Sequence, residues 1–274
     1  MTAATAAPTH RAMQRPALYV VPVCPFCQRA EVMLALKGAP DAVELRTVDI
    51  TRPRDPEFLA LTRGTTATPV LVTGRGVLKE SLVLMRYLDA TVAGPRVTRD
   101  DPFERAVEDA LLAMEGDFSA AGYRFVLNQD PAQRDALERA YLAQVARIDD
   151  YLRWRSPDGD FLFDRFGLAE CAFTPLLQRF WFLDYYEGFA LPADRFARFA
   201  RWRDACLAHP AAQQVTFEQI IKSYYDYALG AGNGALLPGR AVSSFALSPD
   251  WRARPMPPRD KYRHRATDAE LGLV

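Results

Sequence analysis

Two cysteines separated by two residues, Cys24 and Cys27, lie in a Cys-Pro-Phe-Cys segment near the start of this chain. The apolar run at residues 17–21 predicts a strand before them, and residues 28–37 predict a helix after them. A cysteine at a helix start faces unpaired backbone N–H groups and the positive end of the helix dipole. Both favour the thiolate, which is the reactive form of cysteine. We therefore expect sulfur chemistry at Cys24.

Other interpretations of the cysteines have less support. A zinc site would need more ligands, but there is no second Cys-x-x-Cys segment, and the histidines His10, His209 and His264 are isolated. The same shortage of histidines leaves a Cys-His catalytic dyad unsupported. A buried structural pair of cysteines stays open as an alternative. Cys171 and Cys206 fall within helical patterns, and we expect both thiols to be inert.

Two dipeptides further along the chain suggest a ligand site beside the thiol. Thr68-Pro69 opens an apolar strand, a position where proline is tolerated, and we expect this proline to be cis and to face Cys24. Glu80-Ser81 lies where a strand meets a helix. The Ser81 hydroxyl and the free N–H groups there could bind a carboxylate, while Glu80 could bind an ammonium group. A γ-glutamyl head carries both groups on one carbon and fits this combination.

The elements expected around these residues alternate as β-α-β-α-β-β-α, which is the thioredoxin-like order. We predict one thioredoxin-like α/β domain over residues 17–91, followed by a linker at 92–101 whose composition breaks the pattern. Its expected strands cover residues 17–21, 43–50, 69–73 and 77–80, and its helices cover residues 28–37, 56–63 and 81–90.

Beyond the linker no strand pattern is convincing, which predicts an all-helical domain over residues 102–229. Asp101-Pro102 and Asp130-Pro131 are typical helix starts and predict helices of roughly 20 and 24 residues. Residues 230–274 are rich in Gly, Pro and Arg but also carry aromatic residues, so we expect an ordered extension that wraps the helical domain. Further helices are expected at residues 169–183, 193–208 and 211–229, the first with a capping box at Gly167 and Glu170.

Charge and composition bound the function. Lys and Arg total 34 and Asp and Glu total 34, so no basic excess supports a nucleic-acid or anionic-membrane partner. No apolar run approaches the roughly 20 residues that span a bilayer. Residues 1–16 lack the apolar core of a signal peptide, and we expect a disordered leader on a cytoplasmic protein. Four cysteines in 274 residues do not make a disulfide scaffold.

Together, the Cys24 segment, residues 68–71, residues 79–89 and the helical second half resemble the cytosolic glutathione transferases. The Cys-Pro-Phe start is similar to the omega class, in which the catalytic residue is cysteine. Further segments resemble the bacterial glutathione lyases of lignin β-aryl-ether breakdown, and they lie at residues 161–167, 173–175, 179–186 and 251–261. The resemblance implies the cytosolic glutathione transferase fold, glutathione as co-substrate and a homodimer.

The resemblance also implies roles for individual residues. Cys24 would be the nucleophile, and Glu80 and Ser81 would hold the γ-glutamyl group. The backbone of Thr68 would pair with the cysteinyl unit. The remaining glutathione contacts would come from Pro25, Phe26, Pro69 and Arg54, with Arg54 a candidate for the glycyl carboxylate and Arg52 its substitute.

The expected reaction is attack of the Cys24 thiolate on the sulfur of a glutathione thioether. Carbon leaves readily only as an enolate, so the substrate should be an α-glutathionyl aryl ketone, and a nearby hydroxyl should stabilise the developing charge. Tyr225 is the first choice for that donor, followed by Tyr224 and Tyr123. A second glutathione would release the enzyme as glutathione disulfide forms.

Two alternatives stay open. Omega-type sites generally use one cysteine, so Cys27 is a departure that keeps a glutaredoxin-like reductase of glutathione mixed disulfides possible. The other is a non-catalytic scaffold with the transferase fold, a role that would not require the Cys24, Thr68-Pro69 and Glu80-Ser81 features together.

Overall fold

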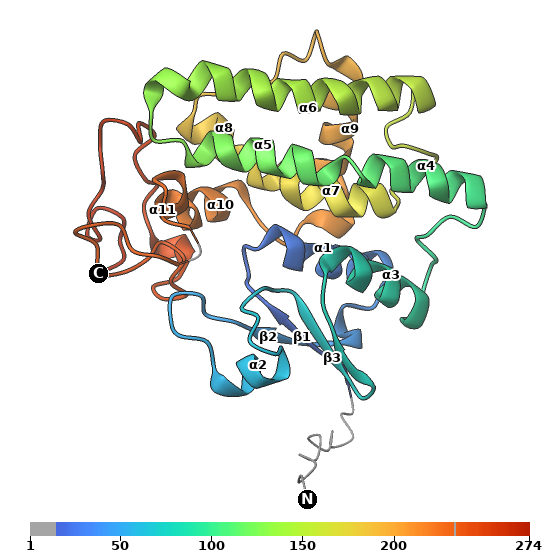
Figure 1. The fold of residues 1–274 in the computed structure, drawn as a ribbon, viewed down its shortest axis with the longest axis horizontal. Coiled ribbons are helices and arrows are strands. Elements are labelled where there is room, and N and C mark those ends of the chain that lie inside the picture. The colour runs from blue at the N-terminus through green and yellow to red at the C-terminus, as the bar shows by residue number, and fades with distance from the viewer. Residues whose placement is uncertain (1–14, 233) are drawn as a thin grey trace, which may run out of the picture.

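The computed structural model describes residues 15–232 and 234–274, and it forms two adjoining layers (Figure 1). The leader expected over residues 1–16 falls mainly on residues 1–14, which lie outside the described residues. One layer is a four-stranded sheet with its helices, and the other consists of helices α4 to α11 and the C-terminal residues. The predicted fold class, an α/β thioredoxin-like domain followed by an all-α domain, is confirmed.

The sheet has the strand order β2-β1-β3-β4, in which β1 and β2 run parallel and the other neighbours run antiparallel. Side chains of β1 and β3 alternate between its two faces. Leu18 and Leu71 join the main core beneath α1, whereas Ala17 and Val70 pack with Phe58 of α2 on the other face. The elements are β1 (Ala17–Val20), α1 (Pro25–Leu36), β2 (Glu44–Thr47), α2 (Pro56–Leu61), β3 (Val70–Thr73), β4 (Gly76–Leu78) and α3 (Ser81–Thr91).

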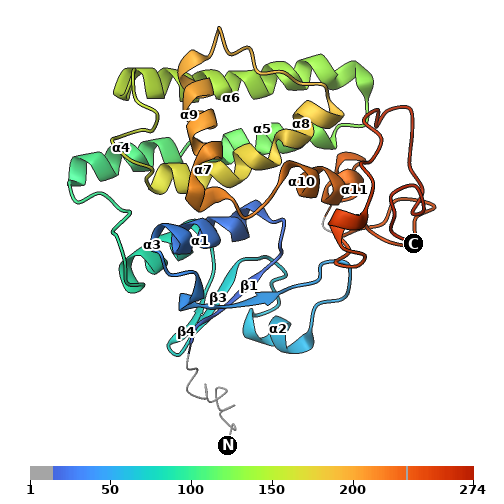
Figure 2. The same ribbon diagram turned by 180° about the vertical axis from the view of Figure 1, so that it is seen from behind.

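The described residues of the second layer form helices and loops with no strand, and α9 crosses α6 and α7 on the side seen in Figure 2. Asp101 caps α4 as predicted, since its carboxylate accepts a hydrogen bond from the Glu104 N–H at 3.0 Å. The helices are α4 (Pro102–Leu112), α5 (Glu115–Leu127), α6 (Arg134–Arg155), α7 (Leu168–Arg179), α8 (Trp181–Tyr186), α9 (Ala197–Ala208), α10 (Phe217–Ser223) and α11 (Tyr225–Ala228).

Several long helices expected from the sequence are divided or shortened in the structure. Asp130 caps only a short 3₁₀ turn, and the long helix α6 begins after it. The helix expected at 211–229 is wrong because Thr216 starts a new helix there, accepting a hydrogen bond from the Gln219 N–H at 3.2 Å. The backbone also leaves helical geometry at Phe180, which separates α7 from α8, and at Phe196, just before α9 begins. Apolar periodicity continues across such breaks, so it does not reveal them.

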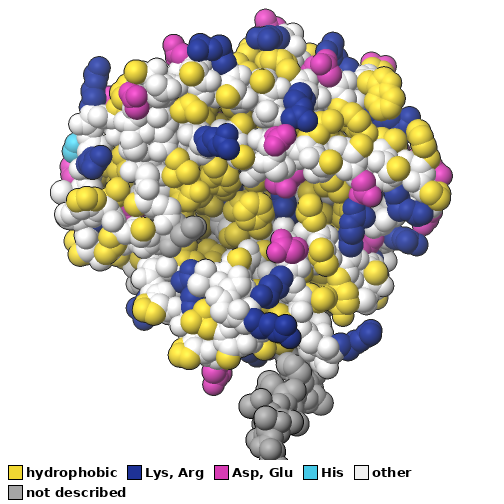
Figure 3. Space-filling model, in the orientation of Figure 1, with side chains coloured by type: hydrophobic (Ala, Val, Ile, Leu, Met, Phe, Trp, Pro, Cys, Tyr) yellow, Lys and Arg dark blue, Asp and Glu magenta, His cyan; other side chains and the backbone are white. Residues whose placement is uncertain are grey.

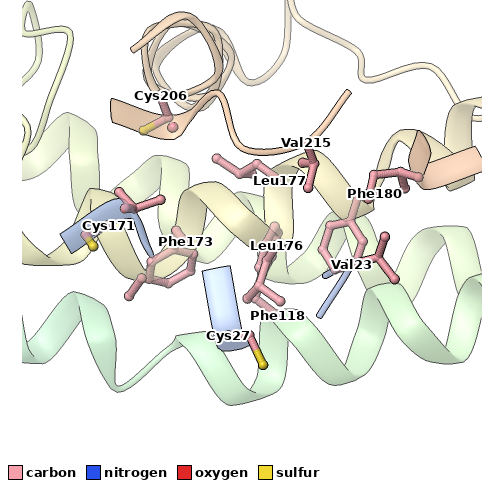
Figure 4. Close-up of a cluster of buried hydrophobic side chains, with 14 of the residues drawn as sticks. Val23, Cys27, Phe118, Cys171, Phe173, Leu176, Leu177, Phe180, Cys206 and Val215 are labelled. Atoms are coloured by element: carbon pink, nitrogen blue, oxygen red, sulfur yellow. The ribbon is translucent and has the colours of Figure 1, made fainter. Parts of the chain in front are cut away.

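One buried cluster joins the two layers. Helix α1 packs against α3 on one side and α7 on the other. Figure 4 shows Cys27, Cys171 and Cys206 among apolar side chains of this cluster, which include Phe118 and Leu176. Burial raises the pKa of the Cys171 and Cys206 thiols above its ordinary value, which agrees with the expectation that both are inert.

The C-terminal residues 230–274 follow an irregular path beside α10 and α11 (Figure 1). Lys261 anchors this segment: its Nζ lies 2.5 Å from Oε1 of Glu187 and donates to the carbonyl of Asn128 at 2.8 Å. The Tyr262 hydroxyl donates to the same carboxylate at 2.9 Å. In the part of the chain that the structure describes, no helix is both long and apolar enough to cross a bilayer.

Candidate active site

Cys24 occupies the N-cap position of α1, and Pro25 is the first helical residue. A tight turn presents it, because the Cys24 N–H donates to the carbonyl of Val21 at 2.9 Å. The side chain of Cys24 is half-buried, whereas that of Cys27, one turn along the helix, is fully buried. The sequence-predicted position of a thiol at a helix start is therefore confirmed.

The two thiols differ in acidity. A hydrogen bond from the Cys27 thiol is the main cause that lowers the pKa of Cys24 to about 7, against the effect of burial. Burial and the neighbouring Cys24 sulfur raise the pKa of Cys27 well above its ordinary value. The Cys27 sulfur in turn accepts a hydrogen bond from the Val21 N–H at 3.4 Å. Both cysteines are free, and Cys24 is the more readily ionised thiol of the pair.

Cys24 opens into a cavity of about 570 Å³ between the two layers. In Figure 3, apolar side chains gather in a hollow between the sheet layer and the helical layer. Five of the residues predicted to serve the site line this cavity from the N-terminal domain. They are Cys24, Pro25, Phe26, Arg54 and Thr68.

The remaining predicted ligand residues do not line the cavity. The peptide bond between Thr68 and Pro69 is cis, as expected. Glu80 is exposed and has a φ of 66°, in the left-handed region that non-glycine residues rarely adopt. Ser81 is buried at the start of α3, and its hydroxyl oxygen accepts a hydrogen bond from Nη1 of Arg29 at 3.0 Å. Strain at a loop residue of this kind is common at ligand sites.

Arg54, and not its substitute Arg52, reaches the cavity. Nη1 of Arg54 donates to the carbonyl of Asp49 at 3.2 Å, which holds the half-buried guanidinium against the loop before α2. The side chain of Arg52 is 80% exposed and pairs with Asp49 at 3.3 Å. Arg54 is thus the better placed of the two for an anionic group.

The prediction of Tyr225 as the substrate donor is wrong in position. Its side chain is fully buried, its hydroxyl accepts a hydrogen bond from the Ala266 N–H at 2.6 Å, and it does not line the cavity. Tyr225 faces the C-terminal segment because successive residues of a helix point in different directions. Three other tyrosines and one phenylalanine form the wall opposite Cys24, namely Tyr123, Tyr224, Tyr227 and Phe245.

Two buried arginines support the Cys24 segment, and sequence reasoning assigned neither a role. Arg29 on α1 pairs with Glu115 at 2.7 Å and bonds to the carbonyl of Ala172, which ties α1 to α5 and α7. Arg179 at the end of α7 donates to the carbonyl of Val23 at 2.7 Å. The sequence signal that could have found them is an arginine within a strongly apolar helix pattern, because a charged side chain is rarely buried without a partner.

No group of three or more His, Cys, Asp or Glu side chains within residues 15–232 and 234–274 could hold a metal ion.

Comparison with known proteins decides the family. Residues 18–96 match the sequence model of the glutathione S-transferase N-terminal domain, and residues 131–205 match that of the C-terminal domain. The chain belongs to the glutathione S-transferase family.

Several relatives of this chain come from plants. Protein IN2-1 of Zea mays is 32% identical over 163 residues, which cover 59% of this chain and 64% of that protein. The chain spans only between 53% and 64% of the length of the first curated relatives it matches.

Solved structures show the same fold. A rice glutathione transferase in complex with glutathione has a TM-score of 0.64 at 21% identity, covering 74% of this chain and 92% of that one. Omega glutathione transferase 3C of Trametes versicolor has a TM-score of 0.63 at 20% identity, covering 75% of this chain and 90% of that one. At such identities the likeness establishes the transferase fold alone.

Proposed function

We propose that this transferase is a glutathione-dependent enzyme of omega type that removes glutathione from α-glutathionyl aryl ketones. The observation that carries the proposal is the Cys24 thiol, with a pKa of about 7, facing a wall of tyrosines across one cavity. A transferase that conjugates glutathione must stabilise the glutathione thiolate. A cysteine thiolate at that position would instead attack the sulfur of a glutathione thioether and form a disulfide as the sulfur–carbon bond breaks.

Glutathione would bind along the N-terminal domain. Arg54 offers a cation to the glycyl carboxylate, and the backbone of Thr68 offers hydrogen bonds to the cysteinyl unit. Glu80 and Ser81 would hold the γ-glutamyl ammonium and carboxylate groups at the start of α3. Pro25, Phe26 and Pro69 would shape the surface around the glutathione sulfur.

In the first step, the Cys24 thiolate attacks the thioether sulfur and the sulfur–carbon bond breaks. The electron pair of that bond leaves as the enolate of the ketone, which then takes a proton. In the second step, the thiolate of a free glutathione attacks the Cys24–glutathione disulfide and restores the Cys24 thiolate. The ketone is thereby reduced, and two glutathione molecules are oxidised to one glutathione disulfide.

The enolate oxygen needs a donor, and Tyr123 replaces Tyr225 in this role. Burial is the main cause that raises the pKa of Tyr123 well above its ordinary value, so the phenol keeps its proton near neutral pH. The Tyr224 hydroxyl already donates to the carbonyl of Val23 at 2.8 Å. Tyr227 lines the same wall and is the second choice.

The helical domain supplies an aromatic wall for the aryl group. Tyr123 and Tyr227 pack edge to face with ring centroids 5.5 Å apart, and Tyr224 packs edge to face against Phe245 at 5.1 Å. The resemblance of the segments 161–167 and 251–261 to bacterial glutathione lyases supports substrates from lignin β-aryl-ether breakdown. On the same resemblance we propose a cytoplasmic homodimer.

The alternative is a glutaredoxin-like reductase, which would share the Cys24 mixed disulfide. The hydrogen bond between Cys27 and Cys24 is the observation that favours it. The raised pKa of the buried Cys27 thiol weighs against Cys27 as the resolving nucleophile.

Product analysis with a glutathionyl aryl ketone and free glutathione tests the proposal. We expect the glutathione-free ketone and glutathione disulfide in equal amounts, and no turnover by Cys24→Ser. Conjugation of glutathione to an electrophile without disulfide formation, at full rate in Cys24→Ser, would contradict it. Turnover of simple glutathione mixed disulfides with no reaction of the ketone would favour the reductase.

A further inference from the structure

Arg179, the last residue of α7, is a fully buried cation beside the segment that carries Cys24. Two other buried cations of the chain meet a carboxylate: Arg29 pairs with Glu115 at 2.7 Å and Lys37 with Asp89 at 3.2 Å. No Asp or Glu of the described residues lies within 4.0 Å of the Arg179 guanidinium. A buried charge without a counter-charge is unfavourable, so we expect an anionic group near the Arg179 guanidinium.

Arg179 donates hydrogen bonds to residues on both sides of Cys24 in the sequence. Nε donates to the carbonyl of Val23 at 2.7 Å, directly before the cysteine. Nη1 donates to Oε1 of Gln28 at 2.6 Å, in the first turn of α1 after it. Nη2 is buried and has no hydrogen-bond partner within the described residues. The guanidinium thus fixes both flanks of the cysteine and keeps one donor unused.

The arrangement extends to the phenolic wall. The carbonyl of Val23 also accepts the hydroxyl of Tyr224 at 2.8 Å, so Arg179 and Tyr224 meet at one oxygen atom. The side-chain amide of Gln28 continues the network to Gln178, at 2.7 Å. Movement of Arg179 would therefore disturb the turn that presents the thiol.

We propose that Arg179 is the positioning residue that supplies the positive counter-charge for the Cys24 sulfur when that sulfur is anionic. This inference rests on the proposed role of Cys24 as the reacting thiol. The electrostatics agree, because the Arg179 guanidinium adds to the Cys27 hydrogen bond in lowering the pKa of Cys24, and it opposes the rise that burial causes in the pKa of Tyr224.

Other groups around the thiol act on the same ionisation. Cys27 on α1 donates to the Cys24 sulfur, and Tyr123 on α5 and Tyr224 between α10 and α11 face it from the helical domain. Arg54 and Tyr227 line the cavity. Glu31, also on α1, interacts electrostatically with Arg179. Burial raises the pKa of the Glu31 carboxyl, and the Arg179 guanidinium opposes that rise. Variants of Arg179 leave all of these groups in place.

The test measures the ionisation of Cys24 and not its turnover. Arg179→Gln keeps a hydrogen-bond donor but removes the charge, and Arg179→Met removes both. The rate of alkylation by iodoacetamide is followed from about pH 5.5 to about pH 10, and peptide mass spectrometry assigns it to Cys24. We expect both neutral variants to titrate above the native Cys24, part of the way toward the ordinary thiol pKa of about 8.5, with about threefold less thiolate at pH 7, because the Cys27 hydrogen bond remains.

Arg198→Gln is the matched control. Arg198 is also buried, donates to backbone carbonyls at Ser156 and Phe161 and has an unpartnered Nη1, but it lies on α9 and none of these hydrogen bonds reaches the Cys24 segment. Its removal should leave the Cys24 titration unchanged. At pH 10 the Cys24 thiol is ionised in every variant. A difference in alkylation rate at that pH therefore reports a change in the access of iodoacetamide to Cys24, and not a change in its ionisation.

An unchanged midpoint in a folded Arg179→Gln or Arg179→Met variant would overturn the inference. Should neither neutral variant fold, Cys27→Ala decides, because it removes the other cause of the low pKa: a Cys24 midpoint still below that of an ordinary thiol supports the counter-charge, and an ordinary midpoint overturns it. The proposed lyase function fails separately, through product analysis, whatever the alkylation shows.

Discussion

The hydroxyl of Tyr224 donates to the carbonyl of Val23 at 2.8 Å, joining the end of the helical domain to the residue before the nucleophile. The bond spans 201 residues of sequence. This hydrogen bond uses the phenolic proton of Tyr224, the residue directly before the predicted donor Tyr225. Tyr224 therefore orients the segment that carries the Cys24 thiol. The hydroxyl that can donate to substrate must come from elsewhere on the wall.

Tyr123→Phe should slow the lyase step by about 10²–10³-fold, the effect of removing one oxyanion donor. Reduction of a simple glutathione mixed disulfide, which has no carbonyl, should barely change. Tyr225→Phe is the control, because Tyr225 bonds to Ala266 in the C-terminal segment and should affect both reactions alike. Equal slowing of both reactions by Tyr123→Phe would remove Tyr123 from the donor role.

The rate of thiol transfer should follow the ionisation of Cys24, whose pKa is about 7. Below that value kcat/KM should rise about tenfold per pH unit, and above it the profile should level, because the thiolate is the reacting form. Cys27→Ala should move this profile to higher pH, since the Cys27 hydrogen bond that it removes is the main cause of the low pKa. A steady-state profile for both proteins measures this, and coincident profiles would be the contrary result.

Folding stability should respond to the same group. The folded-state pKa of Cys24 lies below that of an ordinary thiol, so its contribution is fully present above the unfolded pKa of about 8.5. It is lost as the pH falls through the folded-state value of about 7. Urea unfolding of the native protein should therefore show a rise in stability across this window that Cys24→Ser lacks. Parallel curves for the two proteins would contradict the lowered pKa.

The two-domain fold was predictable because the order of strands and helices, the turn residues and the cap at Asp101 are local properties of the chain. The position of Cys24 was predictable for the same reason. The choice between Tyr225 and its neighbours was not, because Tyr224 lies where α10 and α11 divide, and no local pattern marks that break. The role of Arg179 depends on contacts with Val23 and Gln28 more than a hundred residues away.

Ser81→Ala and Glu80→Gln should both weaken glutathione binding, by about 1–3 kcal/mol each, the range for losing a hydrogen bond to a charged group. The two should differ in stability. Ser81→Ala also removes the acceptor of a buried Arg29 hydrogen bond, whereas Glu80 is exposed. Calorimetric titration with glutathione and thermal unfolding measure the two effects. Unchanged affinity in both variants would move the γ-glutamyl site elsewhere.

The anchor of the C-terminal segment gives the last prediction. Lys261 and Glu187 form an ion pair at 2.5 Å in which both side chains are fully buried. Lys261→Met leaves the buried Glu187 carboxylate with only the more distant Arg134 as its cation, at 4.0 Å, and should lower the free energy of unfolding by about 3 kcal/mol. The double variant Lys261→Met with Glu187→Leu removes both charges and should recover much of that loss.

Arg263→Met, at an exposed pair with Asp260, is the control and should cost less than about 1 kcal/mol. Urea unfolding of the four proteins compares these values. If Lys261→Met is as mild as the control, the ion pair does not anchor the C-terminal segment. Phe245 precedes Lys261 in this segment and lines the Cys24 cavity, so the aromatic wall would then need another support.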